Sequence, residues 1–207
     1  MSGEGSSAPG FHMSKARVET LVDGVFAIAM TLLILEVKVP ELQNPRSIGE
    51  LLGSLRHAAP TALAYFASFF MLGLFWVWHH RLAEKVRAFD RALLVLTFCF
   101  LSLVSSFPFA AALWGRYHLN VGSMVVYGPV LGLILFCQVL FLAVARRHDL
   151  LREDVDPAEI RQAHKRNIMG LAFFLLGISP AALPFGLAVF AVVIVLAALA
   201  FLAFKRA

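Results

Sequence analysis

The sequence predicts an all-α, polytopic membrane protein with six transmembrane helices. Of its 207 residues, 60% are hydrophobic and 15% are charged, whereas soluble proteins average about 45–50% apolar and about 25% charged residues. The mean hydropathy of +0.80 points the same way. Apolar segments of about 20 residues, the length that spans a bilayer, recur along the chain. A single water-soluble core is therefore excluded, and the length favours one domain.

The predicted spans are separated by charged or proline-containing segments, and no internal repeat is visible, so we expect one six-helix unit. They cover residues 18–38, 58–80, 90–113, 121–145, 166–182 and 185–204. Residues 1–14 are rich in glycine and serine and lack the apolar region of a secretory signal. We interpret them as a disordered lead-in or a tag remnant, which leaves residues 15–207 as the transmembrane domain.

The basic residues predict the orientation of the helices. With the N-terminus in the cytoplasm, only Lys38, Arg46, Arg56 and Arg116 fall outside, which leaves fourteen of the 18 lysines and arginines on the inner side. The positive-inside rule then predicts a multi-pass protein of the cell membrane with both termini in the cytoplasm. This topology also explains the net charge of +5, and no nucleic-acid partner is expected.

The segment 146–166 mixes charges of both signs. Asp156 followed by Pro157 is typical of a helix N-cap and first helical position. We interpret the segment as a solvated cytoplasmic helical linker, with a regulatory surface as the alternative.

The first span is unusually short between charges. Asp23 and Glu36 flank an uncharged stretch of 12 residues, Gly24 to Leu35. About 10–14 apolar residues are few for a helix that faces lipid. The length suits a helix that is shielded by other helices and whose charged ends meet water or protein.

Helical spacing places part of this span on one stripe. Ile28, Leu32 and Leu35 follow the i, i+4, i+7 pattern, and Thr31 flanks them. The pattern permits two interpretations, namely ordinary helix packing or the lining of a path through the membrane.

Asp23 lies about 140° from Ile28 on a helical wheel, so we expect it to face into the bundle. An ionisable group inside a span costs about 2.5–3.5 kcal/mol and needs a partner. The second span ends at matching depth with Trp76, His79 and His80, whose ring N–H groups could donate to the carboxylate. We predict a packing anchor here, while an aromatic belt with interfacial histidines is the alternative.

The first two helices resemble the transmembrane protein 175 family, the endolysosomal potassium channels and their prokaryotic homologues. The family pattern Arg-xxx-Phe-Ser-Asp is matched by Arg17 and Asp23, with Leu21 and Val22 replacing Phe and Ser, and GVFAIAMTLLILE follows it. In the second helix the matching residues are Ser68, Phe69, Trp76, His79 and His80. The other four helices match only in span count and charge pattern.

The resemblance implies a homotetrameric potassium channel whose first helices surround the central axis. Similar proteins select potassium, and larger monovalent cations, over sodium without the Thr-Val-Gly-Tyr-Gly carbonyl filter, which is absent here too. Carried over by position, Ile28 would form the narrowest hydrophobic ring. Leu32 and Leu35 would form further rings toward the outside, and Thr31 a hydroxyl layer.

The resemblance also assigns a structural anchor, in which Arg17 and Asp23 tie the first helix to Trp76 and His79. Glu36 has two open interpretations: it concentrates cations at the outer mouth, or it pairs with Lys38.

Three other classes compete with a channel. A secondary transporter predicts broken helices or inverted repeats with polar groups near the midplane, which are not visible. An enzyme would need one buried constellation, and the only candidates are Asp23, His57, His79 and His80, of which His57 starts its helix on the other side. An intramembrane scaffold is the third. No enzyme activity, cofactor or metal site is predicted.

Overall fold

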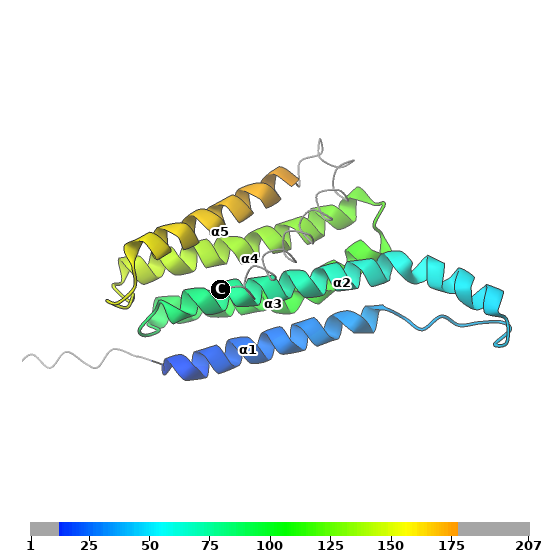
Figure 1. Cartoon of the computed structure of the whole chain (residues 1–207), viewed down its shortest axis with the longest axis horizontal. Helices are drawn as coiled ribbons and strands as arrows, with labels where there is room; N and C mark the ends of the chain where they lie inside the picture. The colour runs from blue at the N-terminus through cyan, green and yellow to red at the C-terminus, as the bar shows by residue number, and fades with distance from the viewer. Residues whose placement is uncertain (1–12, 178–207) are drawn as a thin grey trace, which may run out of the picture.

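The computed structural model describes residues 13–177 as a bundle of long, roughly antiparallel helices (Figure 1). In chain order the elements are α1 (Lys15–Leu32), the 3₁₀ helix η1 (Leu33–Glu36), α2 (Ile48–Glu84), α3 (Arg91–Arg116), α4 (Val121–Arg147) and α5 (Pro157–Gly177). Four segments within these residues are long and apolar enough to cross a membrane, namely α1 with η1, α2, α3 and α4. The all-α membrane class and the first four spans are thus confirmed. The predicted span 185–204 and the end of the fifth, 178–182, lie outside the described residues.

Helix α2 begins ten residues before the predicted start at position 58. The Ser47 side chain accepts a hydrogen bond from the Glu50 N–H at 3.2 Å, and the Glu50 carboxylate accepts two from backbone N–H groups of the preceding loop, at 2.6 and 3.0 Å. Its 37 residues rise about 55 Å, against about 30 Å for the hydrocarbon layer. The first turns therefore extend beyond the membrane. The hydropathy pattern marked only the part of α2 that crosses the membrane, whereas the N-cap at Ser47 starts the helix before that part.

Two clusters of buried apolar side chains hold the helices together. The larger joins α1 to α2, α3 and α4, and its most buried aromatic members are Phe26, Phe75, Phe100 and Phe107. The smaller lies at the end where the α2–α3 and α4–α5 loops meet, and it includes Val18, Leu82, Phe89, Leu93, Phe141 and Ala163. Because α1 contributes to both clusters, its whole length is fixed against the bundle on one side.

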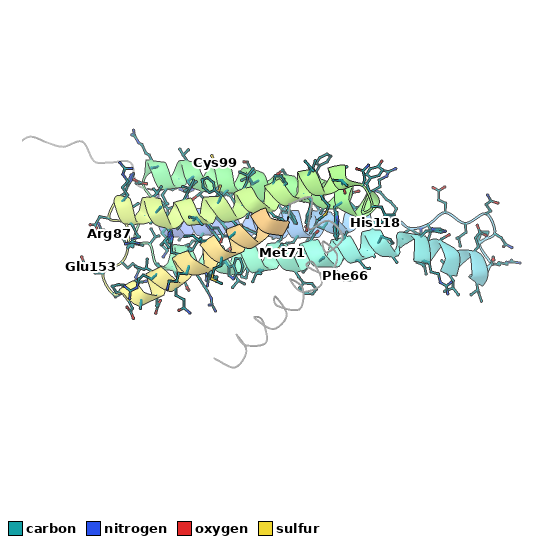
Figure 2. All side chains as sticks on the ribbon, turned by 90° about the horizontal axis from the view of Figure 1, so that it is seen from above. Phe66, Met71, Arg87, Cys99, His118 and Glu153 are labelled. Atoms are coloured by element: carbon teal, nitrogen blue, oxygen red, sulfur yellow. The ribbon has the colours of Figure 1, made fainter. Side chains whose placement is uncertain are left out.

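The α2–α3 loop and the α4–α5 loop are joined at one end of the bundle, opposite His118 (Figure 2). Val86 and Leu151 form an isolated antiparallel bridge, flanked by two backbone hydrogen bonds of 2.8 and 3.0 Å. The Lys85 side chain contacts the carboxylate of Glu159 in α5. We call these contacts the loop clasp.

The structure corrects the interpretation of residues 146–166 as a solvated helical linker: part of the segment is helical, but two of its side chains are buried. The predicted cap is confirmed, since Asp156 accepts a hydrogen bond from the Ala158 N–H at 2.7 Å and α5 begins at Pro157. This helix continues without a break into the fifth predicted span, and Leu150 and Ala163 are buried in the smaller cluster. The charges of the segment hid these buried side chains, because hydropathy averages over both faces of a helix.

Candidate functional site

Helix α1 and η1 pack one face against the rest of the chain and leave the other face uncovered. The buried residues recur at helical spacing and are Val18, Val22, Phe26, Ala29 and Leu33. On the uncovered face Ile28, Leu32 and Leu35 expose 61%, 44% and 59% of their surface. The stripe predicted from the sequence therefore coincides with an apolar face that the rest of the described chain does not cover.

Thr31 lies on the uncovered face beside Ile28. Its hydroxyl donates to the backbone carbonyls of Ala27 and Ile28, each at 2.9 Å. With the proton engaged by the helix backbone, the oxygen keeps both lone pairs as hydrogen-bond acceptors. Near the N-terminal end of this face, a Cβ added to Gly24 would meet nothing within 4 Å. The uncovered face thus offers aliphatic side chains, one hydroxyl acceptor and open space at Gly24.

Glu36 ends η1 and is exposed at the C-terminal end of the stripe. It makes no ion pair with Lys38, so of the two interpretations the pairing is absent from the structure. Its carboxylate is open to the medium next to Leu35.

Asp23 and Trp76 lie in direct contact. The indole Nε1 of Trp76 donates a hydrogen bond to the Asp23 carboxylate at 2.7 Å, which links α1 to α2. The expectation that Asp23 faces into the bundle is wrong, because the residue is exposed and Trp76 is 37% exposed. Asp23 is about 100° from the buried Val22 on the helical wheel. It therefore lies at the margin between the two faces of α1.

The side chains of His79 and Arg17 do not make the polar contacts that the predicted anchor requires. The His79 ring is buried between helices, stacked on Phe100 at 4.4 Å between centroids and edge-on to Phe141 at 5.1 Å. Neither of its nitrogens has a hydrogen-bond partner among the described residues, so it is not bonded to Asp23. The Arg17 side chain is exposed and makes no hydrogen bond or ion pair with the rest of residues 13–177. Asp23 is six positions after Arg17, which places the two about 120° apart around α1.

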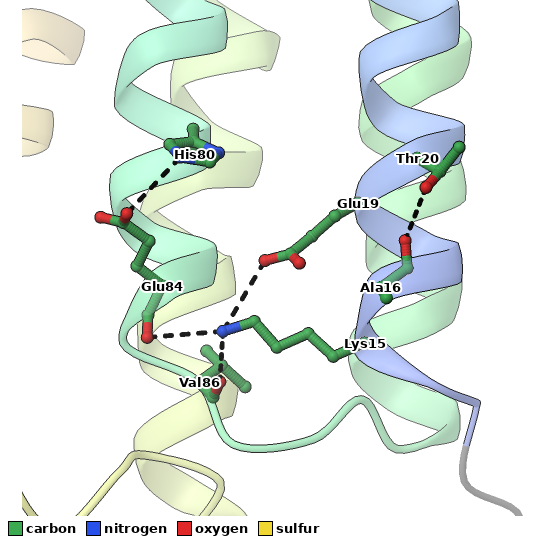
Figure 3. Close-up of polar contacts among 7 residues, drawn as sticks. All are labelled: Lys15, Ala16, Glu19, Thr20, His80, Glu84 and Val86. Atoms are coloured by element: carbon green, nitrogen blue, oxygen red, sulfur yellow. Dashed lines mark hydrogen bonds and ion pairs between the residues drawn. The ribbon is translucent and has the colours of Figure 1, made fainter.

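A second link between α1 and α2 was missed from the sequence (Figure 3). The Lys15 ammonium donates to the Val86 carbonyl at 3.0 Å and to the Glu84 carbonyl at 3.5 Å. It also lies 3.7 Å from the Glu19 carboxylate, while His80 pairs with Glu84 at 3.5 Å. The i, i+4 spacing of Lys15 and Glu19 was the available signal. These contacts fix the N-terminal end of α1 against the C-terminal end of α2.

Asp90 joins the start of α3 to the end of α4. Its carboxylate accepts from the Leu93 N–H at 2.8 Å and contacts Nδ1 of His148 at 2.5 Å. Partial burial raises the pKa of Asp90, but the hydrogen bonds from His148 and Leu93 outweigh it. The net pKa therefore lies below its ordinary value. The pair adds a charged contact beside the loop clasp.

The chain resembles known proteins in both sequence and structure. The profile of the family described as endosomal/lysosomal potassium channel TMEM175 matches residues 17–108, which contain the uncovered face of α1 and η1, Asp23, Trp76 and His79. A potassium channel of Streptomyces collinus is 34% identical over 159 residues, covering 74% of this chain and 76% of its own. The chain belongs to the TMEM175 family. This is a family of ion channels rather than of enzymes.

Other TMEM175 relatives extend the comparison. The crystal structure of a lysosomal potassium-selective channel TMEM175 homolog from Chamaesiphon minutus has a TM-score of 0.74 and 30% identity, covering 89% of this chain and 96% of its own. A single-residue variant of the potassium channel MtTMEM175 shares the fold with a TM-score of 0.62 at 17% identity, over all of both chains. The human endosomal/lysosomal proton channel TMEM175 is 40% identical over 103 residues, 47% of this chain and 20% of its own.

Proposed function

We propose that this chain is the subunit of a potassium-selective cation channel, in which four copies place α1 around a central axis. The observation that carries the proposal is the uncovered face of α1 and η1, with Ile28, Leu32 and Leu35 exposed and Thr31 among them. The names of two bacterial relatives, both potassium channels, and of the potassium-selective homolog support the choice of ion.

Symmetry converts the uncovered face into rings. Four copies around one axis give four identical side chains at each level, so Ile28, Leu32 and Leu35 form three apolar rings and Thr31 a ring of hydroxyls. An apolar ring constricts by dewetting, because a passing ion loses water that nothing replaces. Potassium and larger monovalent cations hold their water less tightly than sodium and lose less there. Selectivity then needs no carbonyl filter.

The proposed subunit spans the cell membrane six times through residues 15–207, with residues 1–14 as a lead-in and both termini in the cytoplasm. The described part supports this orientation. The start of α1 and the α2–α3 and α4–α5 loops lie at the same end of the bundle (Figure 1). That end carries most of the basic residues, as the positive-inside rule requires of a cytoplasmic face.

The proposal also assigns roles around the rings. The hydrogen bond from Trp76 to Asp23 sets the rotation of α1, and hence which side chains face the axis. His79 supports this anchor by packing, Arg17 belongs to it by its position in the family pattern, and Glu36 attracts cations at the outer mouth.

Ion flux through purified protein in liposomes tests the proposal. We expect potassium to move down its gradient faster than sodium, and flux that rises with concentration without the saturation of a transporter. A pH-sensitive dye measures proton movement in the same vesicles, because the animal relatives are named proton channels. An intact tetramer that passes no cation across a range of pH and voltage would be a scaffold and would refute the proposal.

A substitution on the uncovered face tests the rings. Ile28→Asn places an amide at the constriction, so we expect sodium flux to rise relative to potassium flux. Ile34→Asn is the matched control, since Ile34 is 45% exposed, lies nearly two turns farther along and points about 80° away from Ile28 and about 120° away from Leu32. Equal sodium flux in Ile28→Asn and in the unmodified protein would remove Ile28 from the constriction.

A further inference from the structure

A group of buried polar side chains lies inside the chain, away from the uncovered face of α1. Gln138 of α4 and Asn167 of α5 are 0% exposed, and His79 of α2 is 2% exposed. Both ring nitrogens of His79, Oε1 of Gln138 and both side-chain heteroatoms of Asn167 have no hydrogen-bond partner within the described chain. Buried polar atoms are nearly always paired with protein or water. So many unpaired atoms in one region therefore call for a ligand.

The packing of α4 against α5 places Asn167 opposite Gln138. Ala163 packs with α4 side chains of the smaller cluster near the loops, while a Cβ on Gly170 would lie 3.6 Å from the Leu135 side chain, farther along. The two helices thus run antiparallel, and Asn167 shares one helical face with Ala163 and Gly170. Counting along α4 from Leu135 toward its C-terminal end, the residue at the level of Asn167 is Gln138.

Gln138 connects this level to His79. Its Nε2 donates to the Phe75 carbonyl at 3.2 Å, one turn before His79 on α2. The His79 ring lies edge-on to Phe141, one turn beyond Gln138 on α4. His79, Gln138 and Asn167 therefore lie at one depth of the bundle, and we call them the polar layer.

We propose that the polar layer binds a small cluster of buried water molecules. Water can donate to Oε1 of Gln138 and Oδ1 of Asn167, accept from Nδ2 of Asn167, and donate to or accept from the two His79 nitrogens. A buried water typically makes about three hydrogen bonds to atoms that would otherwise be unsatisfied. The unpaired atoms supply both donors and acceptors, as a neutral ligand of this kind requires.

The surroundings of the polar layer favour water over an ion. The layer contains no carboxylate, and the neighbouring Arg166 holds its guanidinium over the Trp78 ring at 5.4 Å, a positive charge that disfavours a bound cation. His79 also lines a small pocket between α1 and α2 together with Asp23 and Trp76. The site lies off the proposed axis and does not depend on whether the protein conducts ions.

Radiolytic footprinting of the full chain in lipid nanodiscs tests the proposal, because X-rays generate hydroxyl radicals from bound water in place. Phe141 contacts the layer and Phe107 does not, yet they are 2% and 0% exposed. We expect Phe141 to be oxidised several-fold faster than Phe107, and Gln138→Leu to slow Phe141 without changing Phe107. Equal oxidation of the two rings in the unmodified protein would show a dry layer and overturn the proposal. So would a faster Phe141 rate after potassium is replaced by a bulky organic cation, since a bound metal ion would then have occupied the layer.

Thermal unfolding gives an independent test, because a dry layer and a hydrated layer predict changes of opposite sign in the unfolding temperature. In a dry layer Asn167→Leu removes two unpaired polar atoms and raises the unfolding temperature, which would contradict a hydrated site. In a hydrated layer the same change displaces water from Gln138 and His79, so we expect the unfolding temperature to fall by several degrees. Gln162→Leu, at an exposed position of the same helix, is the control and should change it little. If Asn167→Leu does not assemble, the footprinting of the unmodified protein decides.

Discussion

Helices α1 and α4 are both apolar enough to span a membrane, yet the rest of the described chain buries them to different extents. Within the most apolar window of each, 56% of α4 is buried inside the chain against 28% of α1 with η1. Helix α4 lies in the middle of the bundle and packs against α3 and α5, whereas α1 lies at its edge (Figure 1). Hydropathy alone does not distinguish a helix that completes a core from one that must be covered from outside.

The difference lies in how the side chains are distributed around each helix. Helix α1 with η1 places its aromatic residue, Phe26, on the packed side and Gly24, Ala27 and Thr31 on the uncovered side. Small side chains on a helix allow another protein surface to approach closely. In the proposed assembly, the face that carries these small residues together with Ile28, Leu32 and Leu35 is the one that meets further copies of the chain.

Truncation on the two faces of α1 should separate stability from conduction most strongly. Phe26→Ala removes a side chain that is 1% exposed and packs on Phe100 at 5.7 Å, so we expect a loss of about 3–5 kcal/mol. Ile28→Ala, on the open side, should cost less than about 1 kcal/mol in the same assay and alter ion flux instead. Thermal unfolding in detergent measures both. Equal losses of stability in the two variants would mean that the two faces of α1 do not differ in their contribution to folding.

Removal of the indole donor tests the anchor at the margin between the faces. Trp76→Phe leaves the Asp23 carboxylate without its 2.7 Å partner, and we expect a loss of about 1 kcal/mol together with altered ion selectivity as α1 rotates. Trp78→Phe is the matched control on the same helix, since Trp78 makes no hydrogen bond to α1. The selectivity ratio and the unfolding temperature are measured for both variants, and identical behaviour would rule out an anchor at Trp76.

The hydroxyl on the uncovered face should have a smaller effect, confined to conduction. Thr31→Val keeps the shape and removes the oxygen, so we expect potassium-over-sodium selectivity to change by a factor of a few with unchanged assembly. Thr20→Val is the control, because the Thr20 hydroxyl makes the same kind of bond, to the Ala16 carbonyl at 2.8 Å, nearer the inner end. A shift of equal size in Thr20→Val would show a general effect of hydroxyl loss on α1.

The smallest expected effect concerns the charged end of the bundle. Since its folded-state pKa is depressed below 3.8, Asp90 contributes stability that is present above pH 3.8 and is lost as the pH falls through the folded value. Between about pH 5 and about pH 3 the unmodified protein should lose more stability than Asp90→Asn, by less than about 1 kcal/mol because solvent screens the pair. Unfolding temperatures across this range measure it, with the exposed Glu153→Gln as control. Parallel curves for the unmodified protein and Asp90→Asn would contradict the assignment.

Periodicity predicted that Ile28, Leu32 and Leu35 share one face of the helix, because burial in a helix repeats every 3.6 residues, and the three are exposed together. That this face lines an ion path stays a prediction. The contact between Asp23 and Trp76 followed from their matching depth. The position of His79 could not be predicted, since α2 is apolar on nearly every side and its sequence does not fix its rotation. The stacking of His79 on Phe100 is determined by how the helices pack against one another.

The loop clasp and the polar layer could not be predicted from the sequence either. Lys85 and Glu159 are far apart along the chain and lie in segments that look merely solvated. Gln138 and Asn167 are single polar residues with no spacing that relates them, so only the antiparallel packing of α4 and α5 shows that they share one level.

The change from α1 to η1 at Leu33 has a geometric effect on the proposed pore. A 3₁₀ helix turns about 120° per residue, so Leu35 is directly above Leu32, whereas an α-helix would rotate it aside by about 60°. The rise of about 2.0 Å per residue instead of about 1.5 Å also separates these two leucines by about 1.5 Å more. In the proposed pore, the winding of these four residues thus sets the spacing between the Leu32 and Leu35 rings, and with it the length of the path along which a cation is without its hydration shell.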